Sequence, residues 1–128
     1  MDKSNILKTF NDHFVDFVED IQNVFPNDPD ILASKTALLA IRKANPRLII
    51  KIWREHIVSK YKDHIMNGDL SFFIDKDYSA DLSDMDSASS IVKKINVLRE
   101  PIRNMGSENQ EKCMKYIQNL TKLSELYN

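Results

Sequence analysis

Apolar residues recur every three or four positions along most of the chain, the spacing that places side chains on one face of an α-helix. Between these stretches lie glycines, prolines and short polar runs that interrupt a helix. The pattern predicts five helical segments, at about residues 4–24, 29–44, 46–66, 87–105 and 107–127. The short connections between the first three segments predict that they pack as antiparallel neighbours.

Residues at the segment ends support these boundaries. We expect Ser4 to cap the first helix, Asp28 to cap the second, and Gly68 to end the third in a left-handed conformation. Pro101 lies inside the fourth segment and should kink or split it. The run Ser107–Gln110 has the spacing of a capping box, which would open the fifth helix.

The region between the third and fourth segments has no helical pattern. Residues 70–74 form a short apolar run that could be a strand, a helical turn or a plug over the core, and no second strand is evident to pair with it. Aspartates then dominate residues 75–86, so we expect a mobile acidic loop at about 75–87. The sequence therefore predicts an all-α fold, a compact bundle of about five helices in a single domain of residues 1–128.

The acidic loop also has the residue spacing of an EF-hand calcium loop. The matching side chains are Asp75, Asp77, Ser79, Asp81, Ser83 and Asp86. Ala80 stands where this loop needs glycine for its turn, and Asp86 stands where a bidentate glutamate is usual. These two departures favour a polar connection over a calcium site, and we expect no metal or other cofactor.

Composition restricts the class of protein. Apolar residues make up 42% of the 128 positions and charged residues 29%, as in soluble globular domains. The lone cysteine, Cys113, excludes an internal disulfide and fits a reducing compartment, and no apolar run is long enough for a membrane span or signal peptide. We expect a cytoplasmic protein without a membrane contact.

Charge is distributed unevenly, although the net charge is only −1. Residues 42–62 contain seven basic side chains and one acid, whereas residues 63–86 contain seven aspartates and one base. The residues Lys43, Arg47, Lys51 and Arg54 are spaced by four, four and three, which predicts one basic helix face able to bind phosphates or other anions. The alternatives are a solvated face or one neutralised by the acidic block.

No catalytic motif is present. The two glycines form no phosphate-binding loop, and the three histidines have no zinc-ligand spacing with the cysteine. Cys113 shares an apolar stripe with Ile117, Leu120 and Tyr127 near the coiled-coil period, so this segment either packs on the first helix or binds a partner. We therefore expect no enzyme and no small-molecule substrate.

Three stretches of the chain resemble one group of proteins. They are FVDFVEDIQNVFPNDPDI, IRKANPRLIIKIWREHIVSKYKDHI and LREPIRNMGSENQEKCMKYIQNLTKLSELYN, at residues 14–31, 41–65 and 98–128. Together they resemble a family of small uncharacterised helical proteins of nucleocytoplasmic large DNA viruses (giant and algal viruses). The resemblance implies a viral protein in the host-cell cytoplasm, viral factory or virion, and it carries no assigned site residue.

Two functional hypotheses follow. The first is a non-enzymatic protein-interaction or assembly component, plausible as a virion-associated structural protein. It would bind a protein partner or a second copy through the last segment and through the complementary charges of residues 42–62 and 63–86. The alternative is a nucleic-acid-associated accessory factor that binds phosphates through Lys43, Arg47, Lys51 and Arg54.

Overall fold

The computed structural model describes residues 2–69 and 97–127, and all regular structure in these ranges is helical. This confirms the predicted all-α fold. The elements are α1 (Lys3–Val24), α2 (Pro29–Ala44), α3 (Leu48–Ile52), η1 (Trp53–Val58), α4 (Ser59–Met66), α7 (Arg99–Arg103) and α8 (Ser107–Leu126). The predicted acidic loop, its calcium spacing and the start of the fourth segment lie outside the described residues.

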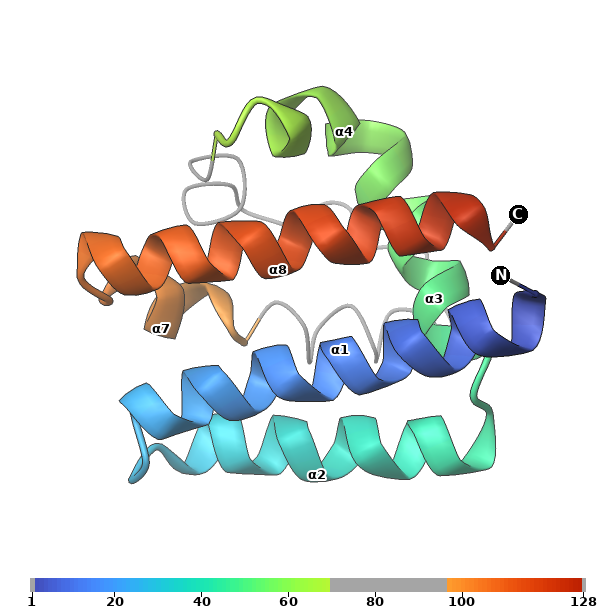
Figure 1. The fold of residues 1–128 in the computed structure, drawn as a ribbon. Helices are drawn as coiled ribbons and strands as arrows, with labels where there is room; N and C mark the ends of the chain where they lie inside the picture. The colour runs from blue at the N-terminus through green and yellow to red at the C-terminus, as the bar shows by residue number, and fades with distance from the viewer. Residues whose placement is uncertain (1, 70–96, 128) are drawn as a thin grey trace.

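Helices α1 and α2 form an antiparallel pair at one side of the molecule (Figure 1). The cap of α1 is Asp2 and not Ser4, because the Asp2 carboxylate accepts a hydrogen bond from the backbone N–H of Asn5 at 2.8 Å. At α2 the expected cap is confirmed: Asp28 accepts hydrogen bonds from the backbone of Asp30 and Ile31, with proline at the first helical position.

The third segment begins at Leu48, two residues later than expected, and it is not a uniform α-helix. Its middle, η1, is a π-helical stretch between α3 and α4. Figure 1 shows that this segment rises from the end of α2 toward α8, so the prediction that it runs antiparallel beside α2 is wrong. Gly68 ends it with φ of 73° and bonds Ile65 O, while Asp69 bonds His64 O, which confirms the left-handed stop.

Gln110 does not complete the capping box predicted at Ser107. Gly106 is the residue before the helix, so Gln110 falls one position too late to bond back to the cap. Its side-chain amide instead donates to the carbonyls of Ile102 and Arg103 at 3.0 and 3.3 Å, joining the end of α7 to α8. Pro101 lies in the first turn of α7, where its missing N–H leaves no hydrogen bond unmade.

One apolar core joins α1, η1 and α8. Phe10 and Phe14 meet the fully buried Trp53 edge to face, with ring centroids 6.3 and 6.0 Å away. The Trp53 indole N–H donates to the hydroxyl of Thr121 on α8 at 3.2 Å, so the polar edge of the ring is also satisfied. Helix α1 therefore lies between α2 on one side and α8 on the other (Figure 1).

Candidate functional site

The four predicted anion-binding residues do not lie on one helix. Lys43 lies in the last turn of α2, Arg47 directly precedes α3, Lys51 belongs to α3 and Arg54 to η1. The expectation of one helical face is therefore wrong for Lys43, because α2 ends before the turn at Asn45. Arg47 and Lys51 do share a face, since the Lys51 N–H bonds the Arg47 carbonyl one turn earlier at 3.2 Å.

Hydrogen bonds fix the turn that carries Arg47. Within the turn, the side-chain oxygen of Asn45 accepts from the backbone N–H of Arg47 at 3.3 Å. From α1, the buried Asn11 side chain donates to the carbonyl of Pro46 at 2.9 Å. Helix α1, which packs against α2 and α8, thus also positions the α2–α3 turn.

A surface hollow of about 430 Å³ opens beside this turn, between the start of α1 and the end of α2. Three of its lining side chains are basic (Lys8, Arg42 and Lys43), and three are apolar (Leu7, Leu39 and Pro46). Ser4 and Asn11 complete the lining. We use the name basic corner for Lys8, Arg42, Lys43, Arg47 and Lys51.

One carboxylate neutralises part of the basic corner. Asp12 forms ion pairs with Arg42 and with Lys8, the latter at 2.9 Å. The Arg42 hydrogen bond, and then that from Lys8, hold the pKa of Asp12 below its usual value, so Asp12 stays ionised at neutral pH. Lys43, Arg47 and Lys51 are exposed and make no ion pair with any residue that the structure describes. The corner therefore keeps an excess of positive charge.

Arg54 differs from the other three predicted residues. It is half-buried and is engaged with another group of the protein, whereas Lys43, Arg47 and Lys51 are exposed. The structure thus brings together Lys43 and Arg47 at the turn, with Lys51 one helical turn further along α3. Most of the acidic block of residues 63–86 lies outside the described residues, so its pairing with these side chains remains a prediction.

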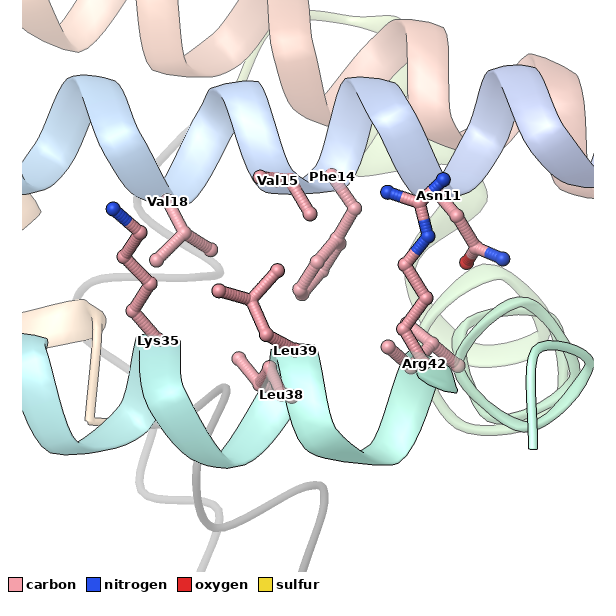
Figure 2. Close-up of a pocket in the computed structure, with 9 residues that line it drawn as sticks. Asn11, Phe14, Val15, Val18, Lys35, Leu38, Leu39 and Arg42 are labelled. Carbon is pink, nitrogen blue, oxygen red and sulfur yellow. The ribbon is translucent and has the colours of Figure 1, made fainter. Parts of the chain in front are cut away.

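A second, smaller space lies between α1 and α2 and is lined mainly by Phe14, Val15, Val18, Leu38 and Leu39 (Figure 2). Its volume of about 10 Å³ is at the lower limit of what one water molecule needs. Arg42 and Asn11 lie together at one end of this space and Lys35 at the other (Figure 2). We interpret it as a small packing gap, because no organic ligand fits this volume.

A groove of mixed charge runs along the contact between α1 and α8. One part, of about 420 Å³, is lined by His13, Asp16, Asp20, Lys112, Lys115, Tyr116 and Asn119. A neighbouring hollow of about 180 Å³ shares three of these residues and adds Cys113. The Tyr116 hydroxyl donates to the Asp20 carboxylate at 2.6 Å, a bond that closes the groove across the two helices.

The pKa shifts of His13 and Cys113 in this groove arise mainly from burial. Burial lowers the pKa of His13 against a weaker opposing effect of Asp16, and its Nε2 atom is buried without a hydrogen bond to the described residues. The His13 ring instead lies 4.7 Å from the Tyr116 ring. Burial, assisted by the charge of Asp20, raises the pKa of Cys113 to about 12, so its thiol stays protonated and poorly nucleophilic at neutral pH.

The apolar stripe of helix α8 packs inside the molecule. Cys113, Ile117 and Leu120 are buried in the core against α1 and η1, and Tyr127 packs at its edge. Of the two alternatives that the sequence left open for this stripe, packing on the first helix or binding a partner, the structure shows packing. These side chains are therefore not available to a partner. The basic side chains of α8 that remain exposed are Lys112, Lys115 and Lys122.

Sequence reasoning missed the residues that α1 adds to the basic corner and to the lining of its hollow. Lys8, Leu7 and Asn11 come from α1, more than thirty positions before the predicted basic residues. The spacing of four between Lys8 and Asp12 signals their ion pair, but no local pattern indicates that Arg42 joins it.

Within the described ranges 2–69 and 97–127, no helix is long and apolar enough to cross a membrane, and no group of three or more histidine, cysteine or acidic side chains could hold a metal ion. In comparisons with known proteins, no family model, curated protein or solved structure matches the chain. Function must therefore be inferred from the geometry and chemistry of the chain itself.

Proposed function

We propose that this chain is a non-enzymatic interaction protein whose basic corner binds an acidic, partly apolar segment of a partner protein. The observation that carries the proposal is the hollow between α1 and α2, where Leu7, Leu39 and Pro46 lie among basic side chains. Apolar side chains of the bound segment would pack into the hollow, while its carboxylates would meet Lys43, Arg47 and Lys51.

Contacts within the protein hold part of the corner in place, which supports binding. Asn11 holds the turn from α1, and Asp12 holds Lys8 and Arg42 beside the hollow. Groups that are already in position lose little conformational freedom when a ligand binds. Exposed charge pairs each contribute about 0.2–1 kcal/mol and mainly accelerate association, so most of the affinity must come from the apolar contacts in the hollow.

Nucleic-acid binding is the second candidate function. It is favoured by the spacing of Arg47, Lys51 and Arg54 on successive turns of one helical path, which could follow phosphates. Two observations favour the protein segment instead. Apolar side chains take up part of the hollow, and none of the residues that line it is aromatic, as base stacking would require.

The proposal also covers where in the cell or virion the protein acts. The resemblance of residues 14–31, 41–65 and 98–128 to proteins of large DNA viruses supports a role in assembly, in the virion or in a viral factory of the host cytoplasm. An assembly component needs a partner-binding surface and no catalytic step, which agrees with the use that we propose for the basic corner.

The proposal is tested by fluorescence anisotropy with two labelled probes of equal negative charge. One is a peptide that alternates glutamate with leucine, and the other is a single-stranded oligonucleotide. The variant K43E/R47E/K51E reverses the three exposed charges of the corner that make no ion pair with a described residue. The matched control K112E/K115E/K122E makes the same change of charge on α8. Circular dichroism checks that both variants remain helical.

We expect wild-type protein to bind the peptide, the corner variant to bind it at least about tenfold more weakly, and the control to stay within about twofold. Equal affinity of wild type and corner variant would contradict the proposal. Preferential binding of the oligonucleotide, lost in the corner variant and falling steeply with salt, would replace it with the nucleic-acid function.

A further inference from the structure

Arg42 is the most enclosed cation of the basic corner. Its side chain is 29% exposed, whereas that of Lys8 is 75% exposed and the other cations of the corner are exposed as well. Arg42 reaches from α2 toward α1 and ends beside Asn11 (Figure 2). It lines the hollow together with Leu39, which lies three positions earlier on the same face of α2. Its surroundings therefore differ from those of the cations at the rim.

One carboxylate holds the guanidinium group of Arg42 and leaves most of its donors unused. The Nη2 atom donates to Oδ1 of Asp12. Neither Nε nor Nη1 donates to any residue within the ranges that the structure describes. A guanidinium has two edges that each present a pair of parallel N–H groups, and such a pair matches the two oxygens of a carboxylate. Asp12 occupies only one edge, so Arg42 is held in place with a second edge available.

The lining of the hollow favours a carboxylate at Arg42. Three apolar side chains and three cations line it, and none of the described residues in the lining is acidic. Opposite charges attract each other more strongly where apolar groups limit their contact with water. A carboxylate inside the hollow therefore gains more from Arg42 than a carboxylate outside it gains from an exposed cation.

We propose that Arg42 determines which segments bind, because its guanidinium takes one carboxylate of the segment with two hydrogen bonds inside the hollow. This inference rests on the partner-binding function proposed above and defines the partner more closely. The segment carries an acidic side chain with an apolar residue directly beside it, since Arg42 and the apolar wall belong to one hollow. Its other acidic residues meet the exposed Lys43, Arg47 and Lys51 and need no fixed position.

Arginine-to-lysine substitutions test this role, because lysine keeps the charge and loses the paired N–H groups. Arg42→Lys should weaken binding of the glutamate–leucine peptide, measured by fluorescence anisotropy, at least about fivefold. The control Arg103→Lys makes the same change in α7, at an arginine that also pairs with an acid, Glu100. The control should stay within about twofold of wild type. Circular dichroism checks that both variants remain helical.

NMR of the wild-type protein gives a second measurement that does not depend on how a variant folds. The side-chain N–H signals of Arg42, assigned through the bonds of the side chain, should move downfield as the peptide is added, because the guanidinium then donates to a carboxylate. Unmoved signals with the peptide bound, or equal affinities of the two variants, would overturn this inference and leave the proposed function in place. Wild-type protein that binds no peptide would overturn both.

Discussion

The hydrogen bond between Trp53 and Thr121 joins the third helical segment to α8 and should be measurable as a coupling energy. Both side chains are fully buried, and the indole N–H donates to the hydroxyl at 3.2 Å. Thr121→Val keeps the shape of the side chain and removes the acceptor. The indole donor is then left buried without a partner, which costs about 1–3 kcal/mol.

The two partners are best separated with a double-mutant cycle. Trp53→Phe removes the donor together with part of the ring, so this variant is destabilised for a different reason, loss of packing against Phe10 and Phe14. In the Trp53→Phe background there is no indole N–H that Thr121→Val could leave without a partner. We therefore expect Thr121→Val to cost about 1 kcal/mol less there than in wild type.

Urea unfolding followed by far-UV circular dichroism measures all four proteins with one signal. Thr121→Ser is the control, because it keeps the hydroxyl and loses only a methyl group. Thr121→Ser should therefore keep most of the coupling energy between residue 121 and the Trp53 indole. Equal destabilisation by Thr121→Val in both backgrounds, within about 0.3 kcal/mol, would refute the reasoning.

Three further changes test other contacts. Asn11→Ala removes the bond to the Pro46 carbonyl and should lower the unfolding free energy by about 1–2 kcal/mol, with faster hydrogen exchange at the turn but not at the end of α8. Gly68→Ala meets no atom within 4 Å yet must adopt positive φ, so urea unfolding should show a loss of about 1 kcal/mol. Because burial lowers the pKa of His13, the unfolded chain takes up this proton more readily than the folded one. Stability should be full above about pH 7 and fall as the pH drops toward 5, and His13→Gln should flatten this decline; an unchanged slope in the variant would contradict the assignment.

Local signals in the sequence predicted those features that depend on local chemistry. Periodicity identified the helices that the structure describes, and Asp28 and Gly68 act as the cap and the stop expected of them. At Ser4 the same reasoning was wrong by two positions, since Ser and Asp are both good caps and Asp2 lies close by. Residue type alone does not choose between neighbouring caps.

Features set by tertiary contacts could not be predicted in the same way. The sequence of residues 48–66 has no proline or glycine that would mark η1 as π-helical, and the stretch is visible only in the folded backbone. Gln110 fits a capping box by spacing, but it bonds α7 because the preceding turn brings those carbonyls close. The basic corner likewise includes Lys8 from α1, and the hollow beside it is lined by Asn11 of the same helix, which is distant in the sequence.

The location of the bound segment is the most direct test of the proposed function. Amide chemical shifts of ¹⁵N-labelled protein should be followed by NMR as the unlabelled glutamate–leucine peptide is added. The account predicts that the largest shifts map to the hollow and the turn beside it, at Leu7, Lys8, Leu39, Lys43 and Arg47. Shifts confined to the exposed face of α8, or none at saturating peptide, would contradict it.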